Sequence, residues 1–195
     1  MSERMRRVDR IHLVGLGGAG QIGQAVARRA QQLGMKVAAY DPVVDPSVLR
    51  TLDIDAHSSL HALLSSVDVV SLHVPGGPAT RGLIGVAELR SMRPGAYLIN
   101  AARGDVIDAH ALRDAVLQGR LGGAAIDVFD PEPPPVDHPL LDVPGVLVTP
   151  HVAGVTERAL ERMSIDVAQG VLDVLAGRAP QHPVVSVGSA SSPSA

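Results

Sequence analysis

A glycine-rich segment has the residue types and the spacing needed to hold a pyrophosphate. It reads Gly15-Leu16-Gly17-Gly18-Ala19-Gly20-Gln21-Ile22-Gly23, lies between an apolar run and a helical pattern, and contains two overlapping GxGxxG patterns. Glycine permits the tight turn and the close approach of pyrophosphate to the backbone, and the following helix N-terminus offers amide donors and a favourable dipole. The segment therefore predicts a dinucleotide-binding turn.

An acidic residue at the end of the next apolar run supports the same interpretation. Asp41 lies 41 − 23 = 18 residues beyond Gly23, near the ~20 expected for a carboxylate that accepts ribose hydroxyls. Because a carboxylate at this place repels a 2′-phosphate, we expect NAD as the cofactor rather than NADP. The helix register and this spacing both favour Gly18, Gly20 and Gly23 as the functional glycines.

The elements around the turn alternate between short apolar runs and helical patterns. Continuous apolar runs are typical of strands buried on both faces, and their alternation with helices predicts a Rossmann-type α/β fold with a doubly wound parallel sheet. In the first helix Ile22, Val26, Ala30 and Leu33 share the apolar face. The predicted strands are 11–16, 36–40, 67–74, 96–101, 123–128 and 146–149, and the predicted helices are 22–33, 46–52, 59–64, 86–90, 109–118 and 156–176.

The composition fits one soluble domain with appendages. The 195 residues are 46% hydrophobic and 2% aromatic, so the core must be aliphatic, and the net charge of −3 gives no argument for nucleic acid or membrane partners. No run approaches the ~20 apolar residues of a membrane span. The segment after the basic start is a poor signal-peptide core, so we expect a cytoplasmic protein. The chain has no cysteine, which excludes disulfides and thiol nucleophiles, and no metal site is expected.

A longer series of motifs resembles the NAD-binding domain of the D-2-hydroxyacid dehydrogenase family. The resemblance extends from about Arg10 to Val187, in the family's order. Its motifs are GQIGQAVA from Gly20, GMKV from Gly34, YDP from Tyr40, LHVP from Leu72, TRGLI from Thr80, MRPGAYLINAARG from Met92, AIDVF from Ala125, EP at Glu132 and TPHVAG from Thr149.

The resemblance implies a catalytic set of an arginine, a glutamate and a histidine, at Arg103, Glu132 and His151. A guanidinium can hold the carboxylate of a 2-oxo acid bidentately and polarise its carbonyl. A histidine can give the carbonyl oxygen a proton as hydride arrives from the nicotinamide. A carboxylate beside the imidazole orients it and keeps that proton available near neutrality. The other histidines are predicted to be structural, with His138 shaping the proline-rich loop 130–139.

The resemblance also implies the cofactor contacts and the reaction. Asp127, at the end of a predicted strand, matches the family residue that fixes the nicotinamide carboxamide. The implied reaction is NAD-dependent hydride transfer between a 2-hydroxy acid and a 2-oxo acid. The complete set of expected cofactor-binding residues is Gly18, Gly20, Gln21, Ile22, Gly23, Asp41, Val74, Pro75, Thr80, Ala101, Ala102, Arg103, Asp127, His151 and Gly154.

The chain departs from the family in two respects. Its glycine turn is three residues longer, and most of the substrate domain is expected to be absent. We expect an NAD-binding domain over 8–155, a C-terminal helix and extended segment over 156–187 as the remnant of the substrate domain, and a disordered tail over 188–195. The helix 156–176 carries two apolar stripes that need cover on two sides, and this favours a homodimer.

Two other functions stay open at this point. An NAD-binding regulatory module would bind the cofactor and a partner without turnover, and an inactive truncated fragment would need a separately encoded first half. The complete Arg-Glu-His set favours the enzyme. The identity of the 2-hydroxy acid does not follow from the sequence, because its specificity contacts would come mainly from the absent region.

Overall fold

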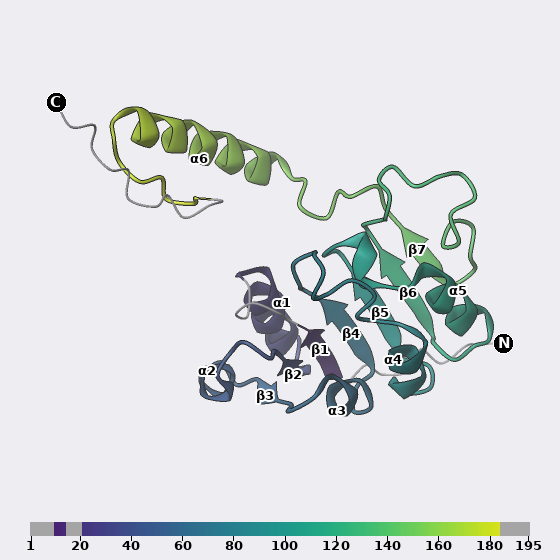
Figure 1. The fold of residues 1–195 in the computed structure, drawn as a ribbon. Helices are drawn as coiled ribbons and strands as arrows, with labels where there is room; N and C mark the ends of the chain where they lie inside the picture. The colour runs from purple at the N-terminus through teal and green to yellow at the C-terminus, as the bar shows by residue number, and fades with distance from the viewer. Residues whose placement is uncertain (1–9, 15–20, 184–195) are drawn as a thin grey trace. The chain divides into compact units, whose positions relative to one another are not determined.

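The computed structural model of the chain describes residues 10–14 and 21–183 (Figure 1). The described residues fall into two compact units that divide between Ala153 and Gly154. The first unit contains the sheet with its surrounding helices, and the second contains one long helix and the segment after it. The predicted functional glycines Gly18 and Gly20 lie outside the described residues.

The first unit is built on a seven-stranded parallel sheet with the order β3-β2-β1-β4-β5-β6-β7. The order runs from β1 to β3 in one direction and from β4 to β7 in the other, so the topology reverses between β1 and β4. Ligands of such sheets bind outside the carboxyl ends of the strands at this reversal. The predicted doubly wound parallel sheet is confirmed. The strands are β1 (Arg10–Val14), β2 (Lys36–Tyr40), β3 (Asp55–Ala56), β4 (Val69–Leu72), β5 (Tyr97–Asn100), β6 (Gly123–Ile126) and β7 (Val146–Val148).

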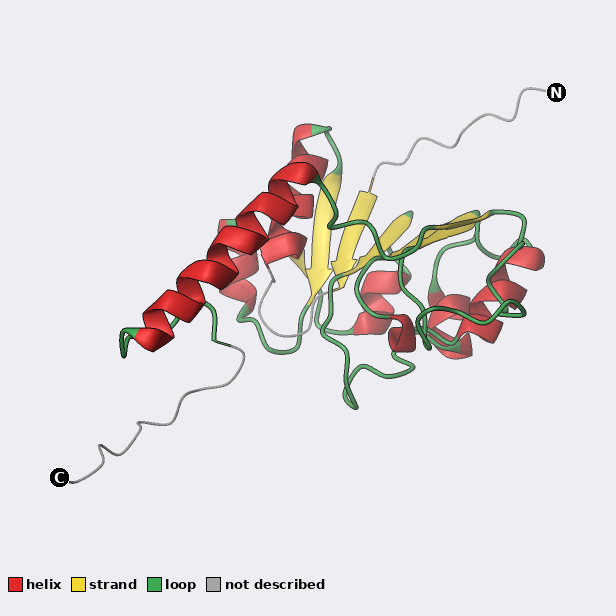
Figure 2. Ribbon diagram, turned by 90° about the horizontal axis from the view of Figure 1, so that it is seen from above, coloured by secondary structure: helices red, strands yellow, loops and turns green. Residues whose placement is uncertain are grey.

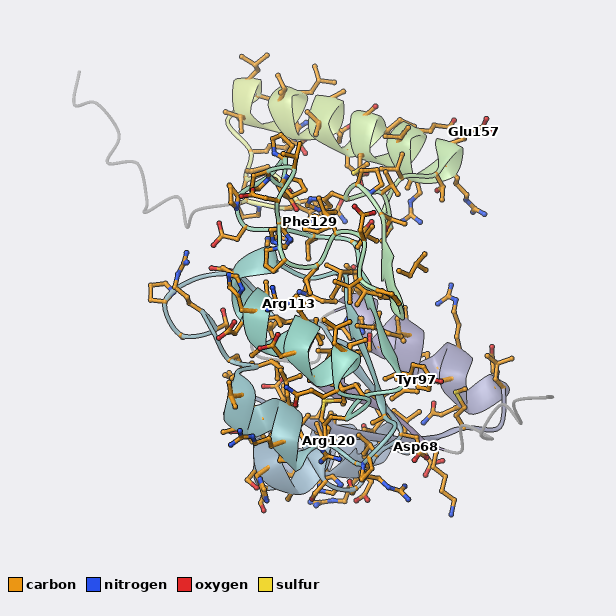
Figure 3. All side chains as sticks on the ribbon, turned by 90° about the vertical axis from the view of Figure 1, so that its right-hand side faces the viewer. Asp68, Tyr97, Arg113, Arg120, Phe129 and Glu157 are labelled. Carbon is orange, nitrogen blue, oxygen red and sulfur yellow. The ribbon has the colours of Figure 1, made fainter. Side chains whose placement is uncertain are left out.

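Helices lie on both sides of the sheet (Figure 2). The side chains of Arg113 in α5 and Tyr97 in β5 lie on opposite sides of the sheet (Figure 3). The core between these layers is aliphatic, as the composition predicts: Leu63, Leu98 and Leu112 are completely buried. The helices of this unit are α1 (Gln21–Gln32), α2 (Pro46–Thr51), α3 (Leu60–Leu64), α4 (Val86–Ser91), the 3₁₀ turn η1 (Gly104–Val106) and α5 (Ala109–Leu117).

The buried face of α1 differs in part from the one predicted. Ile22 is 71% exposed and Leu33 is 78% exposed, whereas Gly23, Ala27 and Ala30 are buried. The reason is the close packing of α1 on the sheet side: a Cβ built on Gly23 would already lie 3.5 Å from the Cβ of His73. Small residues therefore form the centre of the contact face. Of the four predicted residues, Ala30 is buried and Val26 packs partly buried against the core, whereas Ile22 and Leu33 point outward.

The second unit consists mainly of α6 (Glu157–Leu175). The helix begins at Thr156, whose hydroxyl accepts the Ala159 N–H at 3.1 Å, as an N-cap residue does. None of its residues is buried. Leu160, on one of the two apolar stripes, is 48% exposed, and Leu172, on the other, is 57% exposed. Among the described residues, no helix has the length and apolar character needed to cross a membrane.

Candidate active site

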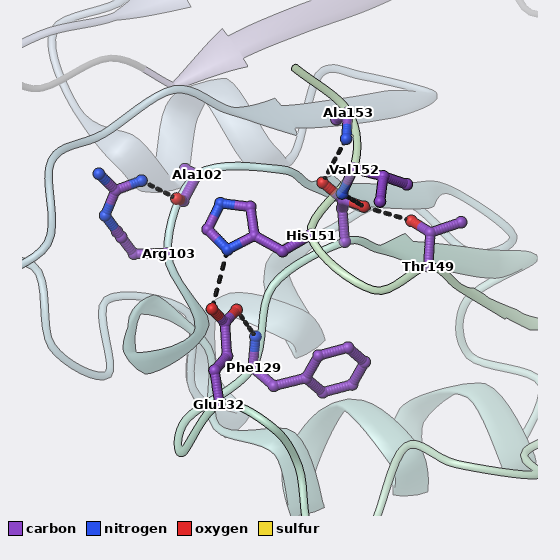
Figure 4. Close-up of polar contacts among 9 residues, drawn as sticks. Ala102, Arg103, Phe129, Glu132, Thr149, His151, Val152 and Ala153 are labelled. Carbon is purple, nitrogen blue, oxygen red and sulfur yellow. Dashed lines mark hydrogen bonds and ion pairs between the residues drawn. The ribbon is translucent and has the colours of Figure 1, made fainter. Parts of the chain in front are cut away.

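The turn after β5 carries Arg103 and is held by a buried amide. Asn100, the last residue of β5, accepts the Ala102 N–H on Oδ1 at 3.0 Å and donates from Nδ2 to the Arg103 carbonyl at 2.9 Å. The guanidinium of Arg103 donates from Nη1 to the Ala102 carbonyl at 2.6 Å (Figure 4). The Asn100 side chain thus fixes the backbone from which the guanidinium extends.

Two glycines define the space around Arg103. A Cβ built on Gly104 would lie 2.0 Å from the carbonyl carbon of Phe129, so the turn after β5 touches the backbone after β6. A Cβ built on Gly76 would lie 3.0 Å from Cγ of Arg103. The stem of Arg103 therefore lies directly against the loop that follows β4, and Gly104 brings its turn next to the segment that leads to Glu132.

A hydrogen-bonded pair of Glu132 and His151 forms the centre of the site. Nδ1 of His151 lies 2.8 Å from Oε2 of Glu132, and the Phe129 N–H donates to Oε1 at 2.8 Å (Figure 4). The bond from His151, followed by that from Phe129, holds the pKa of the Glu132 carboxyl below its usual value. Since Nδ1 faces the carboxylate, Nε2 is the ring nitrogen that can transfer a proton.

Asp127 follows β6 and lies against the turn that carries His151. Its carboxylate accepts the Thr149 hydroxyl and the Val152 N–H on Oδ1 and the Ala153 N–H on Oδ2, the last two at 2.9 and 2.8 Å. Burial alone would raise the pKa of Asp127, but these hydrogen bonds and the nearby His151 lower it below its usual value. His151 itself has a φ of 55°, in the left-handed region.

Asp41 presents a buried oxygen at the carboxyl end of β2. Oδ1 accepts the N–H groups of Val43 and Val44 at 2.9 and 3.3 Å. Oδ2 is buried and has no hydrogen-bond partner among the described residues. Buried polar oxygens are nearly always paired in folded proteins. Oδ2 can therefore accept a hydrogen bond from a donor that a ligand supplies, such as a ribose hydroxyl.

Comparison with known proteins identifies the family. The domain described as D-isomer specific 2-hydroxyacid dehydrogenase, NAD binding domain, matches residues 5–153. This chain belongs to the D-isomer specific 2-hydroxyacid dehydrogenase family. It is 43% identical over 166 residues to the (S)-sulfolactate dehydrogenase of Chromohalobacter salexigens, covering 85% of this chain and 54% of that enzyme. It is also 43% identical over 164 residues to the D-3-phosphoglycerate dehydrogenase of Mycobacterium tuberculosis, covering 84% of this chain and 31% of that enzyme.

Solved structures of the family have the same fold. The NAD-complexed D-isomer specific 2-hydroxyacid dehydrogenase of Lactobacillus delbrueckii ssp. bulgaricus is 32% identical, with a TM-score of 0.76, over 89% of this chain and 56% of that one. This chain therefore spans about half, or less, of the length of these family members. The resemblance recognised from the motifs is confirmed.

The remaining cofactor contacts expected for a 2-hydroxyacid dehydrogenase lie on several elements. Gly154 belongs to the second unit. The Thr80 hydroxyl points inward and donates to the Pro75 carbonyl at 2.6 Å, so it holds the loop after β4. In the first turn of α1, Gln21 and Ile22 are exposed and Gly23 is buried. Of the positions after β4 and β5, Pro75 and Ala101 are exposed, whereas Val74 and Ala102 are buried.

The structure adds two residues to those expected from the family resemblance. Asn100 and Gly104 both lie in the motif MRPGAYLINAARG, but the resemblance implies no role for either. A polar amide at the end of an apolar strand needs buried partners, and this is the signal that could have identified Asn100. The contact of Gly104 with Phe129 joins residues far apart in the chain, so it has no local signal.

Proposed function

We propose that this chain binds NAD(H) at the carboxyl edge of its sheet and supplies Arg103, Glu132 and His151 to the interconversion of a 2-hydroxy acid and a 2-oxo acid. The observation that supports this most strongly is the Glu132–His151 hydrogen bond of 2.8 Å on the turns after β6 and β7. When bound, the nicotinamide would supply or accept the hydride. The residues of this chain would bind the substrate and move the proton.

Arg103 is proposed to bind the substrate carboxylate. The guanidinium carries five N–H donors in a planar fork that matches a carboxylate. One nitrogen already donates to the Ala102 carbonyl, which orients the plane of the fork. The packing of its stem against Gly76 limits the positions that the guanidinium can take.

His151 is proposed as the proton donor in reduction and the proton acceptor in oxidation. Glu132 would orient the ring through Nδ1 and stabilise the imidazolium, and the Phe129 N–H holds Glu132 in place. Proton transfer would then take place at Nε2. Incubating the chain with NADH and a panel of 2-oxo acids tests this function. Binding of NADH without any turnover would favour the regulatory module or the inactive fragment instead.

We expect the chain to prefer NADH to NADPH by about tenfold or more, equivalent to ~1.4 kcal/mol, because Asp41 would oppose a 2′-phosphate. Fluorescence titration gives both dissociation constants. Asp41→Asn should bring the ratio towards one, whereas the control Asp45→Asn, which alters the N-cap of α2, should leave it unchanged. Equal affinity of the unchanged chain for both cofactors would contradict the role given to Asp41.

We also expect the chain to form a dimer through α6. Ile165, Leu172 and Leu175 are 60, 57 and 79% exposed. A few hundred Å² of contiguous apolar surface is near the upper limit for monomers, and at ~25 cal/mol per Å² its burial contributes several kcal/mol before the costs of association. Sedimentation at micromolar concentration should show the dimer.

The Leu172→Glu variant should shift the protein towards the 20.2 kDa monomer. Val136→Glu is the matched control, because Val136 is 97% exposed in a loop of the first unit, and it should leave the dimer intact. A monomer in the unchanged protein would refute this association.

A further inference from the structure

The turn that carries His151 closes around one buried carboxylate. Three donors between Thr149 and Ala153 converge on Asp127, which is 6% exposed. We infer that Asp127 is a positioning residue, which holds His151 in its left-handed conformation and thereby sets the hydrogen bond between His151 and Glu132. The inference rests on the proposed function for the role of His151, but the arrangement it describes exists without cofactor or substrate.

The backbone of His151 needs such support. Its φ of 55° brings the Cβ of a non-glycine residue close to the following carbonyl, and such residues persist only where the surroundings over-determine them. Here the supports lie on both sides of His151. The Thr149 hydroxyl binds Asp127 before it, and the N–H groups of Val152 and Ala153 bind the same carboxylate directly after it.

The sheet fixes Asp127 independently of this turn. The Asp127 N–H donates to the Asn100 carbonyl at 2.9 Å, and the Thr149 N–H donates to the Ile126 carbonyl at 3.0 Å. The carboxylate therefore extends from the point where β5, β6 and β7 end side by side. The position of Asp127 therefore determines where the turn places the imidazole of His151.

An ionised carboxylate is required because each oxygen faces donors. In Asp127→Asn the amide nitrogen would face either the Ala153 N–H or the donors of Thr149 and Val152. At least one of these groups would then lose its acceptor in a buried place. Glu132 keeps its own hydrogen bond from the Phe129 N–H. If the turn loosens, we therefore expect His151 to move away from Glu132, which stays in place.

The test uses the full chain without cofactor. Carbon-13 NMR follows the titration of the Glu132 carboxyl, and the HN–Hα coupling and Cβ shift of His151 report its φ. In Asp127→Asn we expect His151 to leave the left-handed region. We also expect the pKa of Glu132 to rise towards its usual value, because the hydrogen bond from His151 contributes most to lowering it. Thr149→Val removes one donor and should give smaller changes in the same direction.

Asp108→Ala is the control for a general loss of stability. It removes the side chain that accepts the Ala111 N–H at 3.0 Å and caps α5, so it should lower the melting temperature and leave the Glu132 titration unchanged. An unchanged Glu132 pKa and His151 φ in both Asp127→Asn and Thr149→Val would overturn the inference, even if NADH binding were weakened. Should Asp127→Asn fail to fold, Thr149→Val decides the question. Because neither readout needs NADH or turnover, a failure of the proposed function would be seen separately.

Discussion

Replacing His151 with alanine is expected to lower the rate of 2-oxo acid reduction by about 10²–10⁴-fold, the usual contribution of a general acid. The loss is large because the imidazole is the group that Glu132 orients, and Nε2 is its nitrogen that can transfer the proton. Initial rates from the loss of NADH absorbance measure the effect. NADH affinity, measured by titration, should change much less than the rate.

Two further variants make this result specific. Glu132→Gln keeps a hydrogen-bond acceptor beside Nδ1 but removes the charge, so it should give an intermediate loss. His110→Ala removes an exposed histidine of α5 and should leave the rate unchanged. If His151→Ala reduced the 2-oxo acid at the wild-type rate, another group would have to supply the proton.

Replacing Gly104 with alanine is expected to destabilise the first unit by about 3 kcal/mol, at the upper end of the usual cost of overpacking. The added methyl group would lie 2.0 Å from the carbonyl carbon of Phe129 and 2.6 Å from the Asp130 nitrogen. Because both atoms belong to the backbone, a side-chain rotation cannot relieve the clash. The change in the free energy of unfolding, measured with urea, checks the size of the effect.

Gly85→Ala is the matched control for this substitution. A Cβ at Gly85 would lie 3.4 Å from Oε2 of Glu88, an ordinary contact at the end of a side chain. We expect a cost of about 1 kcal/mol or less there, the usual difference between glycine and alanine at an N-cap. Equal costs for the two variants would mean that the turn after β5 can move away from Phe129 without penalty.

The sheet was predictable because its longer strands are continuous apolar runs. All four residues of β4 are buried, as expected of a strand covered on both faces. The short β3 was not predicted, since Asp55 and Ala56 carry no apolar pattern and form a strand only by pairing with Ala38 and Ala39 of β2. The contact face of α1 was predicted correctly at Val26 and Ala30 but not at Ile22 and Leu33, because periodicity alone does not show how closely the helix approaches the sheet.

The candidate site was predictable as a set of residue types but not as a network. The motifs placed Arg103, Glu132 and His151 within the family pattern, and Asp41 followed from its spacing after the glycines. The two hydrogen bonds of the Asn100 side chain and the three donors to the Asp127 carboxylate depend on which strands are neighbours in the sheet. Sequence order does not give that arrangement, because β6 and β7 are separated by a proline-rich loop.

The position of β7 in the sheet has a consequence for the stability of the site. β7 is three residues long, ends the strand order and pairs with β6 in the described sheet, so it has fewer ladder bonds than the strands inside. Local opening in proteins starts where protection is lowest, and His151 follows this strand. We therefore expect local opening at this edge to release the imidazole while the inner strands of the sheet stay folded. Hydrogen exchange of the β7 amides should then report a lower free energy of opening than that of the β4 and β5 amides.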